Sequence, residues 1–225
     1  MKNKTAILIF ANSAEFEAIQ KPFPNATVLF ETLNEHTLKV VKGTGIPYFL
    51  SSEQNQIGNS FGERFTNAIK SVYTKGFETV ITIGNDTPHL RAKHILQAES
   101  QLRNNDIVLG PSKDGGFYLM GLKKSYFNSA TFLKLPWQTS ALHRSISKLV
   151  SSKDIKLSYL ELLSDIDSVS DINTIHNSFK VLSEAIKIQL DAYISEEKPI
   201  FSQLDFSVET IFQQLHFNKG SPLFA

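Results

Sequence analysis

Short apolar runs alternate along the chain with longer segments in which hydrophobic residues recur at helical spacing. Runs rich in β-branched and aromatic residues predict strands at 5–10, 47–50, 79–83 and 106–109. Apolar residues three or four positions apart predict helices at 32–41, 61–73 and 92–102. This alternation predicts an α/β fold with three layers, in which a mostly parallel central sheet carries helices on both faces.

The second half of the chain continues the pattern less regularly. A helix is expected to follow Trp137, with Thr139 or Ser140 as its N-cap, and a strand is expected within 156–163. We expect residues 1–180 to form one domain and residues 181–225 to form a helical extension that packs on this domain or on a partner subunit. The extension is too apolar for a free tail, so it needs a surface to pack on, and a second subunit in a homodimer would provide one. Its phenylalanines are Phe201, Phe206, Phe212 and Phe217.

Composition excludes several classes of protein. The 225 residues contain 41% hydrophobic and 20% charged residues, as expected for a folded globular chain. Because the formal net charge is only +1, no general attraction to nucleic acid or to an anionic membrane is expected. The absence of cysteine excludes disulfides, thiolate metal ligands and a cysteine nucleophile. The apolar run near the start is too short for a membrane span, and we expect a cytoplasmic protein.

The predicted central strand ends in Gly84-Asn85-Asp86-Thr87-Pro88. Ligands of open parallel sheets bind outside the carboxyl ends of the strands, which makes Asp86 a candidate site residue. Asp86 or Thr87 could equally cap a helix that begins near Pro88, because both residue types are good N-caps and proline is favoured in the first turn. Both interpretations remain open on these residues alone.

Two apolar strands flank Lys113, Asp114, Gly115 and Gly116. An Asp-Gly pair between apolar runs is typical of a hairpin turn. Alternatively, the glycines allow a ligand to approach the backbone while Lys113 and Asp114 face a charged group. The loop by itself favours the hairpin.

A third polar segment contains Asp165, Asp167 and Asp171. Aspartates two positions apart in extended chain point to one side, which suits a divalent cation. The competing interpretation is that Asp167 or Ser168 caps the helix that follows, and the isolated segment favours this second interpretation.

In this order the motifs resemble those of the bacterial glycosyltransferase-A-like family labelled arsenosugar-biosynthesis-type glycosyltransferases, within the nucleotide-diphospho-sugar transferase superfamily. That family carries Gly-Ser/Asn-Asp-x-Pro, GPxxDGGYYLxGL, Pro-Trp-x-Thr-Ser and DxDTxxDL, which correspond here to 84–88, 110–122, 136–140 and 165–172. The match covers roughly residues 5–180, and the ordered set is far more specific than any single motif.

The resemblance implies a glycosyltransferase that uses a nucleotide-diphospho-sugar, with Mg²⁺ or Mn²⁺ held by Asp86 and Asp167. It further implies that Asp114 acts as a general base or hydrogen-bonds the acceptor, and that Lys113 adds positive charge. Contacts to the nucleotide or sugar are expected from Asn12, Lys21, Asn85, Gly115, Gly116, Trp137 and Thr139. The partners would be the nucleotide sugar and a small-molecule acceptor.

The first loop departs from the family pattern. Members carry Pro-Gly-x-x-Lys-Thr-Arg there, whereas this chain has no glycine or arginine between Ala11 and Pro22, and Glu15 and Glu17 are unsuited to phosphate. Lys21 is the candidate to replace the missing charge. Two alternatives therefore stand beside glycosyl transfer, namely nucleotidyl transfer with release of pyrophosphate, and an inactive binding or scaffold protein that kept the fold.

Overall fold

A mostly parallel sheet forms the centre of the molecule, as the sequence predicted. The computed structural model describes residues 4–139, 141–151 and 155–197, and within them six strands are ordered β2-β1-β3-β5-β4-β6. β5 runs antiparallel to β3 and β4, and the other pairs are parallel. The strands are β1 Thr5–Phe10, β2 Tyr48–Ser51, β3 Thr79–Ile83, β4 Ile107–Pro111, β5 Phe117–Lys123 and β6 Leu157–Tyr159.

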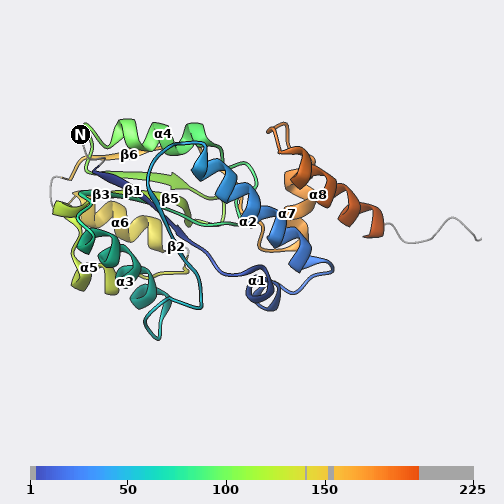
Figure 1. Ribbon diagram of the computed structural model, residues 1–225, viewed down its shortest axis with the longest axis horizontal. Helices are drawn as coiled ribbons and strands as arrows, with labels where there is room; N and C mark the ends of the chain where they lie inside the picture. The colour runs from blue at the N-terminus through green and yellow to red at the C-terminus, as the bar shows by residue number, and fades with distance from the viewer. Residues whose placement is uncertain (1–3, 140, 152–154, 198–225) are drawn as a thin grey trace, which may run out of the picture.

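Helices cover both faces of this sheet. α4 lies over one face, and α3, α5 and α6 lie over the other (Figure 1). The helices are α1 Ala14–Gln20, α2 Ala26–Lys42, α3 Phe61–Thr74, α4 Ala92–Gln101, α5 Ser129–Leu133, α6 Leu142–Ser151, α7 Val169–His176 and α8 Glu184–Glu197, with a 3₁₀ turn at Lys124–Tyr126.

The two-residue period of the strands creates a separate core on each face. In β1, Ala6 and Leu8 pack with residues of α3 and α6, whereas Ile7 and Ile9 pack with residues of α4. Successive side chains of a strand point to opposite faces, so a strand covered on both sides must be apolar throughout. This is why β1 and β3 read as continuous hydrophobic runs in the sequence.

A third apolar cluster joins α1, α2, α7 and α8 beyond the end of the sheet, on the right of Figure 1. Phe30 and Leu33 of α2 pack there with Leu190 of α8. Within the predicted helical extension, α8 begins at Glu184. This helix packs on the rest of the chain through the same apolar cluster. The phenylalanines predicted to anchor the last segment lie outside the described residues.

The structure decides between the competing turn interpretations. The helix after β3 begins only at Ala92 with Arg91 as its N-cap, so the prediction that Asp86 or Thr87 caps it is wrong. Ser168 does precede α7, as predicted, and its backbone N–H donates to Asp171 Oδ2 at 2.8 Å. Of the two caps predicted for α6, Ser140 lies outside the described residues.

Candidate functional site

A cleft of about 490 Å³ opens at the carboxyl ends of β1 and β3. It is bounded by α1, by the β4–β5 hairpin, by the segment before α6 and by the segment before α7. Nine of the residues predicted from the sequence line this cleft: Asn12, Lys21, Asn85, Asp86, Asp114, Gly116, Trp137, Thr139 and Asp167. Residues from five separate parts of the chain therefore meet in one place, as expected at the end of a parallel sheet.

The ammonium of Lys21 is the centre of the charged part of the cleft. Its Nζ lies 2.8 Å from Asp86 Oδ2 and 2.7 Å from Asp167 Oδ1, and it donates to the carbonyl oxygen of Ile166 at 3.0 Å. Burial lowers the pKa of Lys21, but Asp86 and Asp167 more than offset this effect, and its pKa lies well above the ordinary value. Lys21 is therefore fully charged at every physiological pH.

Glu17 of α1 completes this group from the side. Glu17 Oε2 lies 3.8 Å from the ammonium of Lys21, and its Oε1 accepts a hydrogen bond from the Asn12 side chain at 2.8 Å. Burial raises the pKa of Glu17, while Lys21 counteracts the rise. Glu17, which the sequence suggested would be adverse to phosphate, is instead a buried partner of the lysine. We call Glu17, Lys21, Asp86, Asp165 and Asp167 the acidic end of the cleft.

Asp165 was not predicted as a site residue, although it lies two positions before Asp167 in extended chain. Its Oδ1 accepts a hydrogen bond from Thr87 Oγ1 at 2.5 Å. Burial, reinforced by the charge of Asp86, raises the pKa of Asp165 to about 8. The two-residue spacing had already grouped Asp165 with Asp167 in the sequence, but its hydrogen bond from Thr87 could not be foreseen.

The β4–β5 loop is a hairpin that also faces the cleft, so the two interpretations of this loop are compatible. Ser112 N–H donates to the Gly116 carbonyl at 3.0 Å, and Gly115 adopts φ +93°, which favours glycine. Asp114 Oδ1 accepts hydrogen bonds from Ser112 Oγ at 2.5 Å and from Gly116 N–H at 2.9 Å. These two bonds fix a carboxylate at the rim of the cleft.

Lys113 and Gly115, from the same loop, are not among the lining residues. The backbone N–H of Lys113 donates to the Leu163 carbonyl at 3.1 Å, and its side chain is exposed. Asp114, the next residue of the turn, does line the cleft. The predicted roles of Lys113 and Gly115 in catalysis and binding stay predictions.

Asn85 contributes to the cleft from a buried position. Its side-chain amide donates to Asn34 Oδ1 at 2.7 Å, which ties the end of β3 to α2. Asp86 is held on the other side, since its carbonyl oxygen accepts from Ile166 N–H at 2.9 Å. The carboxylate of Asp86 therefore belongs to a backbone that is fixed both to the segment before α7 and to α2.

Aromatic residues form the opposite part of the cleft. Trp137 lies 5.1 Å from Phe65 and 5.8 Å from Phe61 between ring centroids, and Phe10 lies 5.1 Å from Phe65. We call Phe10, Phe61, Phe65 and Trp137 the aromatic wall. The indole N–H of Trp137 donates to the Phe132 carbonyl at 2.7 Å, so the ring is fixed. Trp137 is therefore both a core residue and part of the cleft.

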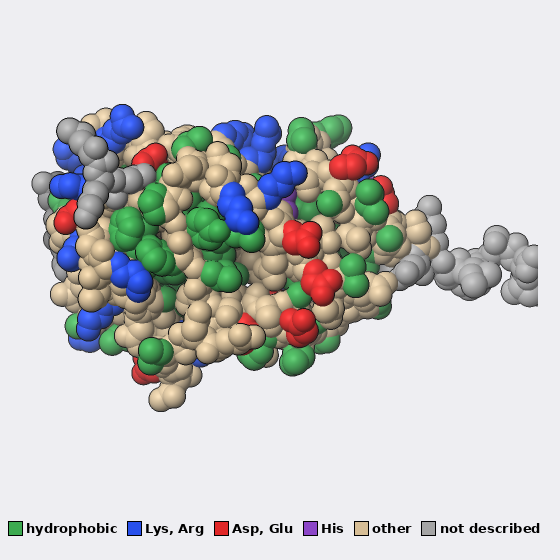
Figure 2. Space-filling model, in the orientation of Figure 1, with side chains coloured by type: hydrophobic (Ala, Val, Ile, Leu, Met, Phe, Trp, Pro, Cys, Tyr) green, Lys and Arg blue, Asp and Glu red, His purple; other side chains and the backbone are tan. Residues whose placement is uncertain are grey.

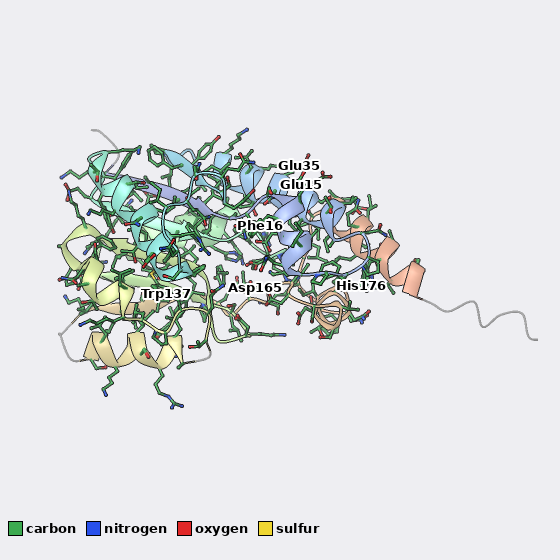
Figure 3. The ribbon with its side chains drawn as sticks, turned by 90° about the horizontal axis from the view of Figure 1, so that it is seen from below. Glu15, Phe16, Glu35, Trp137, Asp165 and His176 are labelled. Atoms are coloured by element: carbon green, nitrogen blue, oxygen red, sulfur yellow. The ribbon has the colours of Figure 1, made fainter. Side chains whose placement is uncertain are left out.

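The figures place these two parts beside different elements. Figure 2 shows that acidic side chains gather toward the right of this face and hydrophobic side chains farther left. Figure 3 labels Trp137 on the side of α5 and α6, whereas Asp165 lies toward α7. The cleft thus runs from a charged region to an apolar region.

The chemistry of the acidic end suits Mg²⁺ or Mn²⁺, the cations predicted from the sequence. Carboxylate and carbonyl oxygens are the ligands these ions prefer, and Lys21 Nζ already marks a position where Asp86, Asp167 and the Ile166 carbonyl hold a cation. Within the described ranges, no cluster of three or more histidine and acidic side chains is arranged to hold a metal by itself. An ion here would need further ligands from a bound phosphate and water, which is usual for Mg²⁺.

Comparisons with known proteins concern the sequence and the fold of the chain. A family model described as "Uncharacterized protein conserved in bacteria (DUF2064)" matches residues 29–139. A "putative nucleotide-diphospho-sugar transferase" from Desulfovibrio desulfuricans G20 superposes with a TM-score of 0.73 at 20% identity, over 86% of this chain and 98% of that chain. The chain has the glycosyltransferase-A-like fold.

Two further solved structures match the chain with lower scores. One is a 4-diphosphocytidyl-2C-methyl-D-erythritol synthase from Anaerococcus prevotii DSM 20548, at a TM-score of 0.46 and 13% identity over 86% of this chain and 96% of that chain. Another is a manganese complex of Rv0371C from Mycobacterium tuberculosis H37Rv. Its TM-score is 0.44 at 13% identity, over 76% of this chain and 97% of that chain. No curated protein sequence matches the chain significantly.

A membrane-spanning helix must be both long and apolar. Across the described residues, no helix combines the length and apolar character that a membrane span requires.

Proposed function

We propose that the protein transfers a glycosyl group from a nucleotide-diphospho-sugar to a small acceptor. One observation carries the proposal. A single cleft of this fold holds the ammonium of Lys21 between Asp86 and Asp167 at one end and presents a fixed aromatic wall at the other. A nucleotide sugar has the same polarity, with a planar base at one end of a doubly charged diphosphate.

The aromatic wall would receive the base or the apolar face of a sugar. Because the indole N–H of Trp137 is already used by Phe132, the wall offers ring surface and not hydrogen bonds. Arg64 of α3 lines the cleft as well, with its Nε donating to Gln56 Oε1 at 3.2 Å. Arg64 and Lys21 are the basic side chains among the lining residues, and both could pair with phosphate oxygens.

Asp86 and Asp167 would hold Mg²⁺ or Mn²⁺, which when bound supplies positive charge to the departing diphosphate. Around that position the chain supplies rigid support. The Asp86 backbone is tied to Ile166, and Ile166 immediately precedes Asp167. The two carboxylates therefore keep their relation to each other when ligands enter and leave.

Asp114 would accept the proton of the acceptor hydroxyl. Its Oδ1 is engaged by Ser112 and Gly116, which orients Oδ2 for a ligand in the cleft. A Cβ at Gly116 would come within 3.2 Å of Asp114 Oδ2. Glycine at this position therefore leaves room beside the proposed base for an acceptor or a sugar.

A product assay tests the proposal. Purified protein with Mn²⁺ is incubated with UDP-, GDP- and ADP-sugars and, separately, with nucleoside triphosphates and a panel of sugars and sugar phosphates. Release of nucleoside diphosphate that depends on Asp114 supports glycosyl transfer. Asp191→Asn is the matched control, because Asp191 is exposed, pairs with His176 at 2.6 Å and does not line the cleft.

Other outcomes separate the alternatives. Release of pyrophosphate from a triphosphate would replace glycosyl transfer with nucleotidyl transfer. If the folded protein gives no heat in calorimetric titration with any nucleotide, with and without Mn²⁺, the proposal is overturned in favour of a binding or scaffold protein.

A further inference from the structure

Lys21 occupies the position between the two carboxylates that a divalent cation would need. Its Nζ is within 2.8 Å of Asp86 Oδ2 and within 2.7 Å of Asp167 Oδ1, with the Ile166 carbonyl at 3.0 Å. These are charge-assisted contacts to three oxygens from two segments of the chain. A metal ion cannot share this place, because the ammonium and the ion would both require the same oxygens.

We infer that Lys21 is a resident cation that a divalent metal must displace, so that the metal alone binds weakly. The inference rests on the metal position assigned in the proposed function. It concerns a property of the free protein, however, and is tested without any nucleotide.

Charge explains why displacement would be coupled to the ligand. Among the residues that line the cleft, Glu17, Asp86, Asp114, Asp165 and Asp167 are acidic, whereas Lys21 and Arg64 are basic. A diphosphate that approached this end without another cation would meet uncompensated carboxylates. If the ammonium moves onto the diphosphate, a divalent ion can take its place between Asp86 and Asp167, so that these two carboxylates and the diphosphate each keep a cationic partner. Lys21 keeps its proton throughout this exchange.

The position of Lys21 in the chain allows such a movement. Lys21 directly follows α1 and has φ −121° and ψ 74°, outside the helical region, so the helix does not restrict its side chain. Its side chain is 16% exposed and reaches the cleft from the edge, with Nζ 5.4 Å from the Phe30 ring. A flexible four-carbon stem can redirect the ammonium without moving the backbone.

Mn²⁺ binding measured by electron paramagnetic resonance, without nucleotide, tests the inference. Lys21→Met removes the resident charge and keeps the length of the stem. We expect it to bind one Mn²⁺ roughly tenfold or more tightly than the wild type does, because two carboxylates lose their competing partner. Adding Asp167→Asn to this variant should abolish the gain, which places the ion at this position.

Lys93→Met is the matched control. Lys93 is an exposed lysine that pairs with Glu161 at 2.9 Å and does not line the cleft. This substitution removes the same charge from the protein and should leave Mn²⁺ binding unchanged. Equal Mn²⁺ affinity in wild type and Lys21→Met would overturn the inference while leaving the proposed function standing.

A second measurement uses the unaltered protein, since Lys21→Met leaves Asp86 and Asp167 unpaired and could unfold the chain. In ¹⁵N-lysine spectra, the Lys21 ammonium should give a signal protected from exchange by its oxygen partners. We expect Mg²⁺ at high concentration to remove this signal. Persistence of the signal after Mg²⁺ has saturated the site would contradict displacement. If the displacement is observed but no nucleotide binds, the proposed function fails and the inference holds.

Discussion

The two ends of the cleft are built by different physical means. At the acidic end, side chains from α1, β3 and the segment before α7 are held by one ammonium and by backbone hydrogen bonds. The aromatic wall is held by ring packing and by a single hydrogen bond from Trp137. The charged end can therefore exchange its partners, whereas the wall cannot move without disturbing the core.

The largest effect is expected at the carboxylate of the hairpin. Asp114→Asn keeps the hydrogen bonds from Ser112 and Gly116 but removes the basic oxygen. We expect kcat to fall about 10²–10⁴-fold with little change in melting temperature. Steady-state kinetics with the active donor, with Asp191→Asn as the control outside the cleft, checks this. An equal loss in both variants would indicate a structural cause.

Removing the wall should cost stability as well as binding. Trp137→Ala deletes a ring that contacts Phe61, Phe65 and Phe132, and we expect a loss of about 3–5 kcal/mol in the free energy of unfolding. Gly62→Ala is the sharper test, since a Cβ there would lie 2.7 Å from Trp137 Cδ1. It should cost about 1–3 kcal/mol by overpacking. Urea unfolding measures both, and a neutral Gly62→Ala would show that the wall can yield.

Asp86 could be proposed as a site residue because strand ends in a parallel sheet converge, whereas Asp114 and Asp167 were proposed from the family resemblance. Asp86, Asp114 and Asp167 are each followed or preceded by a recognisable strand or helix. Glycine and aspartate in the hairpin also carried local turn chemistry that the structure confirms. What the sequence could not supply was the pairing between segments far apart, such as Lys21 with Asp86 and Asp167.

The misplaced cap illustrates the same limit. Asp86 and Thr87 have the right chemistry for an N-cap, but their side chains bond Lys21 and Asp165 instead. Tertiary partners therefore overrode a local preference worth about 1 kcal/mol. The burial of Asp165 and Glu17 was missed for a similar reason, since acidic residues are rarely buried unless they are paired.

Acid should weaken the packing behind the acidic end. His89 follows the Asp86 turn and is buried, with Nε2 3.3 Å from Ser178 Oγ. Burial, and then the charge of Lys180, lowers the pKa of His89 to about 4. The unfolded chain therefore binds the proton more readily than the folded protein between about pH 6.5 and 4, and stability falls as the pH falls through this range.

His89→Gln removes this titration and can still bond Ser178. We expect the variant to lose about 1–2 kcal/mol less than the wild type between pH 7 and pH 4. Urea unfolding at a series of pH values provides the comparison. If the free energy of unfolding changes with pH in the same way for both proteins, the pKa of His89 is the same in the folded and unfolded states.

The smallest effect is expected at Asp165, and it has the opposite sign. Asp165→Asn retains an acceptor for Thr87 Oγ1 and removes a carboxylate from beside Asp86. We expect the melting temperature at pH 8 to rise by a few degrees, which corresponds to about 1 kcal/mol. Differential scanning calorimetry can resolve this shift. A lower melting temperature for Asp165→Asn than for the wild type would mean that the site requires the charge of Asp165.

The antiparallel direction of β5 has a consequence of its own. The chain leaves the sheet at the end of β4 and returns at the start of β5, on the same side of the molecule. The loop between them can therefore gain or lose residues while every strand keeps its register. Under the proposed function, acceptor preference would diverge among related chains through this loop alone, on an unchanged framework.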